Sequence, residues 1–200
     1  MIALLDYGAG NVRSVQKALT AAGGDVQLVP NPDTVAQADA VVLPGVGAFG
    51  AGMQRLQEKG LVECLQARIQ ADRPTLAICL GLQLLCKDSA ETPDVEGLSC
   101  IPASVGRFSD TVTVPQLGWN MLDAENGCKF LSSGYVYYAN SYRIATAPKG
   151  WNTATSQYDG TFCGALERGA ILACQFHPEL SGALGSEILD RWLQQERATC

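Results

Sequence analysis

The residues most able to do chemistry are a cysteine and a histidine that each follow a short apolar run. Cys79 stands between the apolar run Thr75–Ile78 and Gly81. This pattern is typical of a nucleophile elbow, a tight strand-to-helix turn that exposes the sulfur at the edge of a sheet. The start of the following helix would favour the thiolate, and the backbone N–H of Leu80 would face a developing oxyanion. A free cysteine is also an ordinary small core residue, which is our interpretation of the other seven.

His177, the only histidine, directly follows another apolar run at residues 170–175. If this run and Thr75–Ile78 are neighbouring parallel strands, His177 and Cys79 leave the sheet at the same edge. Ligands of open α/β sheets bind at that edge. Glu179 could then bond one imidazole nitrogen and leave the other facing the sulfur. A lone histidine is more often a turn or core residue, but the three side chains together predict a cysteine–histidine–glutamate triad.

A glycine-containing loop, Pro-Gly-Val-Gly at residues 44–47, follows a third apolar run. Glycines let a backbone approach a ligand closely and turn its N–H groups inward. The loop could therefore donate a second oxyanion hydrogen bond, from Val46 or Gly47. It could equally be an ordinary Pro-Gly turn. No phosphate-loop or dinucleotide-binding pattern accompanies it.

The elements that must position these residues alternate between short strands and helices in the first half of the chain. This order favours a parallel sheet with helices on both faces. The second half is mainly strand-like and ends in an amphipathic helix around residues 184–193. We expect one α/β domain over residues 1–200. The predicted strands are 1–6, 25–29, 38–43, 75–78, 135–139, 154–158 and 170–175.

Composition excludes several classes of function. The chain has 14 basic and 20 acidic residues without a Lys/Arg cluster, so we expect neither nucleic acid nor a membrane as partner. No signal peptide or membrane-spanning run is readable. The eight cysteines are scattered without a C-x-x-C pair, and a zinc site would have one histidine at most. We expect a cytoplasmic protein with reduced thiols, no metal and no cofactor.

Two motifs together resemble the triad-type (class I) glutamine amidotransferases. They are the elbow at Cys79, Leu80, Gly81 and Gln83, and the Phe-His-Pro-Glu motif at residues 176–179. Residues 6–11 with Arg13 and Ser14, 43–49 and 118–120 narrow the resemblance to the glutaminase subunits of imidazole glycerol phosphate synthase, over almost the whole chain. The resemblance implies a flavodoxin-like three-layer sandwich: a mostly parallel central sheet, helices on both faces, and an added antiparallel region in the second half.

The same resemblance implies a division of labour among the site residues. Cys79 would attack the side-chain amide of glutamine, His177 would activate the thiol and protonate the departing ammonia, and Glu179 would orient His177. Leu80 and Val46 would supply the N–H groups of an oxyanion hole. The positions that bind glutamine in the family are matched here by Gly47, Gln83, Glu91, Ser141 and Tyr142.

A partner is also implied by the resemblance. Ammonia would pass to a (βα)₈-barrel cyclase subunit in a heterodimer, which makes imidazole glycerol phosphate and aminoimidazole carboxamide ribotide in histidine biosynthesis. Glutaminase activity in such enzymes depends on the ligand of the partner, and loop 44–47 is the expected switch. Asn11, Trp119 and Leu180 are expected at the interface.

Three positions depart from the family pattern. Gln116 and Asn140 stand where a histidine is frequent, and Leu180 stands where a lysine commonly helps to hold the partner. None of them removes a triad member, so the chemistry is expected to persist. The substitution at Leu180 leaves the details of docking and gating open.

Three other functions remain alternatives. A glutaminase for anthranilate, guanylate or pyridoxal phosphate synthesis would keep the chemistry, but residues 6–11 and 118–120 speak against it. A catalytically silent regulatory subunit would be expected to lose a triad residue, and none is lost. A free-standing cysteine hydrolase predicts full activity from the isolated chain.

Overall fold

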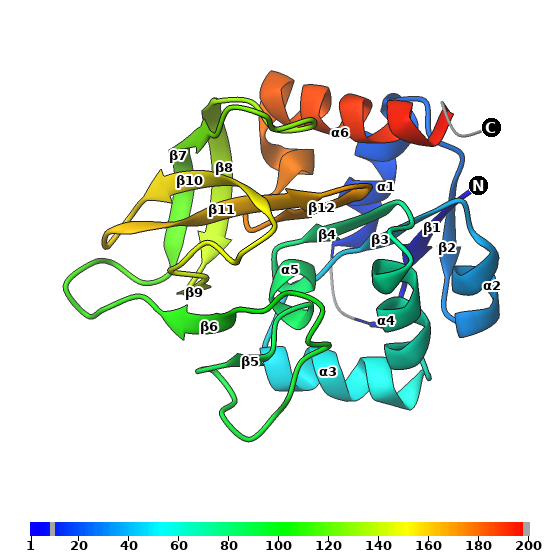
Figure 1. Cartoon of the computed structure of the whole chain (residues 1–200), viewed down its shortest axis with the longest axis horizontal. Helices are drawn as coiled ribbons and strands as arrows, with labels where there is room; N and C mark the ends of the chain where they lie inside the picture. The colour runs from blue at the N-terminus through cyan, green and yellow to red at the C-terminus, as the bar shows by residue number, and fades with distance from the viewer. Residues whose placement is uncertain (9–10, 198–200) are drawn as a thin grey trace.

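The computed structural model describes residues 1–8 and 11–197, and it has a mixed α/β fold built on one large sheet (Figure 1). The strands of this sheet are β1 (Ile2–Leu5), β2 (Val26–Val29), β3 (Ala40–Leu43), β4 (Thr75–Ile78), β7 (Gln116–Ala124), β8 (Gly134–Asn140), β10 (Asn152–Gln157), β11 (Thr161–Arg168) and β12 (Ile171–Cys174). Their spatial order is β2-β1-β3-β4-β12-β11-β10-β7-β8. A smaller sheet contains β5 (Asp88–Ser89), β6 (Ser104–Arg107) and β9 (Tyr142–Arg143).

The first five strands in that spatial order, β2 to β12, run parallel to one another. Their side chains alternate between two buried faces, as a strand with a two-residue period requires. In β3, Leu43 packs into the core on one face and Val42 into the core on the other. In β4, Ala77 and Leu76 divide in the same way. The sheet is therefore the middle layer of a three-layer sandwich, as expected.

Helices cover both faces (Figure 1). α1 (Val12–Ala21) and α6 (Gly182–Arg197) bury apolar side chains against one face. The other face carries α2 (Pro32–Gln37), α3 (Phe49–Glu58), α4 (Val62–Gln70) and α5 (Leu80–Leu84). The closing helix is confirmed as α6, whose Ile188, Leu189 and Trp192 are buried. The sequence analysis missed α2, because its six residues are too few to show a helical period.

The second half of the chain extends the sheet with antiparallel strands. The strands predicted at 135–139, 154–158 and 170–175 are confirmed as β8, β10 and β12, with slightly different bounds. β7 and β11 were not predicted individually. β11 is buried along most of its length, and β7 carries apolar residues on its exposed side, so neither shows the simple alternation of a half-buried strand.

The order of the parallel strands brings three loops to one edge of the sheet. β3, β4 and β12 are neighbours, and loop 44–47, Cys79 and His177 follow their carboxyl ends. Ile78 pairs with Cys174 in register, and the Cys79 N–H donates to the Cys174 carbonyl at 2.7 Å. The predicted meeting of Cys79 and His177 at one edge is confirmed. Within the described ranges, no helix has the length and apolar character needed to cross a membrane.

Candidate active site

Cys79 lies on a strained turn between β4 and α5. Its backbone has φ 54° and ψ −108°, a conformation that residues other than glycine rarely adopt. Gly81 makes the turn possible, because a Cβ there would lie 2.0 Å from the Leu43 carbonyl oxygen. The predicted nucleophile elbow is therefore confirmed as a geometry. α5 has only five residues, so its dipole is a small influence on the sulfur.

His177 links Cys79 to Glu179. Its Nδ1 atom lies 2.9 Å from Glu179 Oε1, and its ring lines the same pocket as Cys79. Backbone contacts hold the main chain of His177 in place, because its N–H donates to the Tyr137 carbonyl at 2.9 Å. The Ser181 hydroxyl donates to the His177 carbonyl at 2.6 Å. The arrangement expected for a cysteine–histidine–glutamate triad is present.

The protonation of His177 is governed by its two neighbours. Burial disfavours the charged ring, but the hydrogen bonds and negative charges of Cys79 and Glu179 outweigh burial and raise the pKa of His177 from 6.5 to about 10. The raised pKa favours the protonated imidazole. In that state it can donate one hydrogen bond to the sulfur and one to the carboxylate.

The backbone donors expected to form an oxyanion hole are not both available. The Leu80 N–H donates to the Gly45 carbonyl at 3.3 Å. The carbonyl of Gly45 and the N–H of Val46 belong to one planar trans peptide and point in opposite directions. The Val46 N–H is therefore turned away from Leu80, and an oxyanion beside Cys79 would need this peptide to rotate. The sequence could not predict the orientation of a single peptide.

A pocket of about 260 Å³ opens over Cys79. This volume suits a ligand smaller than a typical drug. It is lined by nine of the predicted site residues, by Asn140, which departs from the family pattern, and by Pro115 and Ala139. The nine are Val46, Gly47, Cys79, Leu80, Gln83, Glu91, Ser141, Tyr142 and His177. Glu179 lies behind His177 with a side chain that is only 3% exposed.

Two of these lining residues are tied to protein groups. Glu91 Oε2 accepts a hydrogen bond from the Phe49 N–H at 2.7 Å and so holds the start of α3. Gln83 Nε2 donates to the Tyr142 carbonyl at 3.3 Å and to Gln175 Oε1 at 3.1 Å. Both groups are thus oriented by the fold around the pocket.

Gln175 is a contact of the nucleophile that the sequence analysis did not name. It is fully buried, and its Nε2 lies 3.8 Å from Cys79 Sγ. Because the Tyr142 carbonyl can only accept, it fixes Gln83 Nε2, which in turn fixes Gln175 Oε1 and leaves the Gln175 amide donor for sulfur. Its position two residues before His177 was the available signal.

Gln116 and Asn140, two of the departures from the family pattern, pair across β7 and β8 beside the pocket. Asn140 lines the pocket, and Gln116 follows Pro115, which also lines it. Both side chains are buried. Within the part of the chain that the structure describes, Gln116 Oε1 and Asn140 Oδ1 have no hydrogen-bond partner.

An exposed apolar face lies beside the active site on β7, β8 and the 3₁₀ turn η1 (Pro178–Leu180). Trp119 is 57% exposed and stacks edge-on against Tyr137, with ring centroids 6.0 Å apart. We define the apolar face by its exposed large side chains, which are Leu117, Trp119, Met121, Tyr135 and Leu180. Asn11 is exposed in the loop after β1, at the same edge of the sheet as Cys79, where its side chain caps α1. The expected interface residues are therefore accessible.

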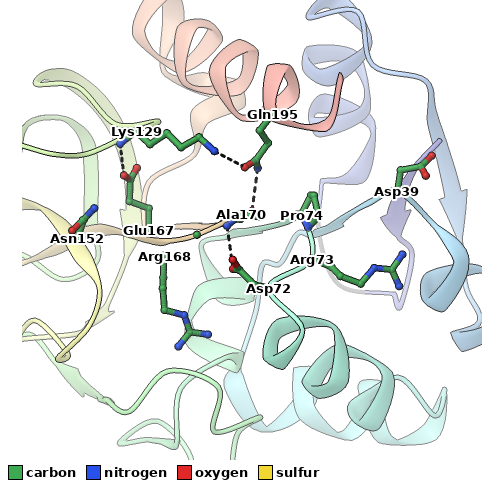
Figure 2. A pocket seen from close by; sticks show the side chains of 11 residues that line it. Asp39, Asp72, Arg73, Pro74, Lys129, Asn152, Glu167, Arg168, Ala170 and Gln195 are labelled. Atoms are coloured by element: carbon green, nitrogen blue, oxygen red, sulfur yellow. Dashed lines mark hydrogen bonds between the residues drawn. The ribbon is translucent and has the colours of Figure 1, made fainter. Parts of the chain in front are cut away.

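A second hollow, of about 670 Å³, lies at the opposite edge of the sheet, where β4 and β12 begin (Figure 2). Its polar side chains bond the protein itself. Asp72 accepts from the Ala170 N–H at 3.1 Å, and Gln195 joins Lys129 to the Ala170 carbonyl. The candidate catalytic groups described above lie elsewhere, so we do not assign this hollow to the chemistry. Among the described residues, no group of three potential metal ligands is present.

The fold and the site define a class of protein: an α/β domain with a cysteine on a strained strand-to-helix turn and a histidine–glutamate pair beside it. The family model of "Glutamine amidotransferase class-I" matches residues 3–195. A solved structure of a glutamine amidotransferase superimposes with a TM-score of 0.79 at 19% identity, covering 98% of each chain. The chain belongs to the class-I glutamine amidotransferase family, and within it to the HisH subunits of imidazole glycerol phosphate synthase.

Two HisH relatives are similar to this chain over nearly their whole length. The HisH subunit of Syntrophotalea carbinolica is 42% identical, with 94% of this chain and 97% of that protein covered. The HisH subunit of Oceanobacillus iheyensis is 38% identical, with 98% and 100% covered. The chloroplastic hisHF protein of Arabidopsis thaliana is 42% identical. The match covers 96% of this chain but only 34% of that protein.

Proposed function

We propose that this chain hydrolyses glutamine to glutamate and ammonia and delivers the ammonia to a cyclase subunit. The cyclase then makes imidazole glycerol phosphate and aminoimidazole carboxamide ribotide in histidine biosynthesis. The observation that carries the proposal is His177, held between Cys79 and Glu179 at the floor of a pocket sized for an amino acid. No cofactor is needed for this chemistry.

In the acylation step, the Cys79 sulfur attacks the side-chain carbonyl carbon of glutamine. The carbonyl π electrons move to the oxygen, which becomes an oxyanion. The protonated His177 ring gives its proton to the amide nitrogen, the C–N bond breaks, and ammonia leaves. A thioester remains on Cys79, and Glu179 keeps the His177 ring in position throughout.

In the deacylation step, the now neutral His177 takes a proton from water as the water oxygen attacks the thioester. A second oxyanion forms and collapses, the C–S bond breaks, and glutamate and free Cys79 result. Both oxyanions need donors, for which we propose the N–H groups of Leu80 and Val46. Each such donor is worth about 10²–10³ in rate. For glutamine binding we propose Gly47, Gln83, Glu91, Ser141 and Tyr142.

The Leu80 N–H is occupied by the Gly45 carbonyl, so the isolated chain should be a poor glutaminase. We propose that the cyclase and its ribulotide ligand favour rotation of the Gly45–Val46 peptide, which would free the Leu80 N–H and turn in the Val46 N–H. The apolar face, together with Asn11, is the proposed docking surface for the cyclase. Leu180 would then contribute apolar contact where a lysine would contribute charge. We also propose that the protein acts in the cytoplasm, in keeping with its seven free described cysteines.

Glutamate release tests the proposal. It is measured for this chain alone, then with the cyclase, then with the cyclase and its ribulotide ligand, and in parallel for Cys79→Ala. We expect strong activity only in the last mixture, and we expect Cys79→Ala to abolish glutamine use while ammonia-dependent synthesis persists. Full activity from the isolated chain would contradict the gating. Loss of both activities by Cys79→Ala at unchanged partner affinity would contradict the division of labour.

A further inference from the structure

Tyr7 is a buried polar group that the mechanism above does not use. It follows β1 at the same edge of the sheet as Cys79, and only 1% of its surface is exposed. Its hydroxyl donates to the Pro44 carbonyl at 2.7 Å. Burial, and next the negative charge of Cys79, raise the pKa of the Tyr7 hydroxyl well above its ordinary value, so it remains a donor.

The backbone at Gly45 is enclosed by Tyr7 and the nucleophile elbow. A Cβ at Gly45 would lie 2.8 Å from the Tyr7 hydroxyl oxygen, 2.7 Å from Leu80 Cβ and 2.9 Å from the Gly81 nitrogen. Distances below about 3 Å exclude a side chain here without movement of the surroundings. The chain therefore runs between the tyrosine hydroxyl and the turn that carries the nucleophile, with room for backbone only.

Two successive carbonyls of this loop are held by different donors. The Pro44 carbonyl is held by Tyr7, and the Gly45 carbonyl is held by the Leu80 N–H. Presenting the Val46 N–H to an oxyanion requires release of the second hydrogen bond, because the Gly45–Val46 peptide must rotate. The first hydrogen bond can persist during this rotation and keep the preceding peptide in place.

We infer that Tyr7 is a positioning residue for the ammonia-releasing reaction, whose hydroxyl anchors Pro44 so that only the Gly45–Val46 peptide rotates and the Val46 N–H arrives at the oxyanion. This role rests on the proposed function and deepens it. Tyr7 does not touch the substrate and acts through Pro44. An oxyanion donor must be placed to within a fraction of an ångström, which is why a fixed pivot beside it matters for rate.

Tyr138 offers a matched control. It is also a fully buried tyrosine, and its hydroxyl lies 2.7 Å from Ser156 Oγ. It belongs to the core on the other face of the sheet and bonds a side chain, whereas Tyr7 bonds the loop beside the nucleophile. Tyr7→Phe and Tyr138→Phe each remove one buried hydroxyl and keep the ring. They differ in the hydrogen bond that is lost, which is to the Pro44 carbonyl in one case and to the Ser156 side chain in the other.

The test measures both variants in complex with the cyclase and its ribulotide ligand. For Tyr7→Phe we expect kcat for glutamine hydrolysis to fall about 10- to 100-fold, with KM for glutamine within about twofold. Alkylation of Cys79 by iodoacetamide, followed by peptide mass spectrometry, should proceed at the wild-type rate, because displacement of iodide develops no oxyanion. Ammonia-dependent synthesis should also be unchanged. Tyr138→Phe should keep kcat within about twofold.

Several results would overturn the inference. Equal kcat values for Tyr7→Phe and Tyr138→Phe would remove any special role for the Pro44 anchor. A parallel loss of kcat and of Cys79 alkylation would mean that Tyr7 supports the nucleophile or the fold, as would failure of Tyr7→Phe to fold. Absence of glutaminase activity in the wild-type complex is a distinct outcome, because it overturns the proposed function itself and this inference with it.

Discussion

Replacing Gly81 by alanine should disable the active site by moving the elbow. The added Cβ would lie 2.0 Å from the Leu43 carbonyl oxygen, whereas real Cβ contacts essentially never fall below 3.0 Å. The elbow and β3 must therefore separate by about 1 Å. The backbone fixes the position of a Cβ, and the Leu43 oxygen is itself a backbone atom, so no side-chain rotation can relieve the contact. A misplacement of this size costs about 10²-fold in rate, and overpacking of this kind costs about 1–3 kcal/mol of stability.

The assay compares Gly81→Ala with Gly52→Ala in complex with the cyclase and its ligand. A Cβ at Gly52, in α3, would meet only the ends of side chains, at 3.1 Å from Leu84 Cδ2 and 3.3 Å from Leu80 Cδ2. Those groups can shift by a few tenths of an ångström, and alanine favours a helix over glycine by about 1 kcal/mol. Gly52→Ala should therefore retain glutaminase activity and fold at least as stably as Gly81→Ala.

Glutamate release and urea unfolding are measured for each variant, with ammonia-dependent synthesis as the check that the complex still assembles. We expect Gly81→Ala to lose about 10²-fold in kcat/KM for glutamine while ammonia-dependent synthesis persists. A Gly81→Ala enzyme with glutaminase activity within about threefold of the wild type would refute the reasoning. It would show that the contact with Leu43 does not constrain the position of Cys79.

Three further predictions concern the triad, its titration and the partner. Glu179→Ala should reduce kcat less than His177→Ala, because orientation contributes less than proton transfer; equal losses in glutamate release would show that Glu179 does more than orient. The pKa of His177 is raised from 6.5 in the unfolded chain to about 10 in the folded protein. Protonation of His177 therefore stabilises the fold fully below pH 6.5, and this stabilisation is lost as the pH rises through about 10. The stability gap between the wild type and His177→Gln, measured by urea unfolding, should therefore shrink from pH 6.5 to pH 10, and a constant gap would contradict the assigned pKa. Trp119→Ala should weaken cyclase binding by about 2 kcal/mol, or roughly 30-fold in Kd, measured by calorimetry. The control is Leu28→Ala, on β2 at the far end of the sheet, which should bind the cyclase with the wild-type Kd. Equal losses of affinity in the two variants would show that the interface does not lie on the apolar face.

Some features of the fold are local enough to be predicted from the sequence. β4 was predicted with its correct bounds, because Thr75 and three apolar residues form a short run between a proline and the cysteine–glycine turn. The strands in the second half were harder to recognise, since β11 is buried on both sides and β7 exposes the apolar face. Burial on both sides and apolar side chains on an exposed side both remove the alternation from which a strand is recognised.

The site residues also separate into those that the sequence predicts and those that only the tertiary structure reveals. Cys79, His177 and Glu179 were found from residue type and spacing, because a nucleophile, a base and its partner must each follow a strand end. Gln175 and Tyr7 were missed. Gln175 offered only its place two residues before His177 as a signal, and Tyr7 carried no local signal. Their contacts with Cys79 and with Pro44 exist only once β1, β3, β4 and β12 lie side by side.

The sequence by itself predicted the candidate nucleophile, its candidate base, the glycine that permits the elbow and the parallel order of the first strands. These depend on conformational rules that act within a few residues, such as the preference of apolar runs for buried strands and the freedom of glycine from a Cβ. The tertiary structure alone decided the raised pKa of His177, the buried contacts of Gln175 and Tyr7, and the occupied N–H of Leu80. These depend on distances between atoms far apart in the chain, and no local pattern encodes such distances.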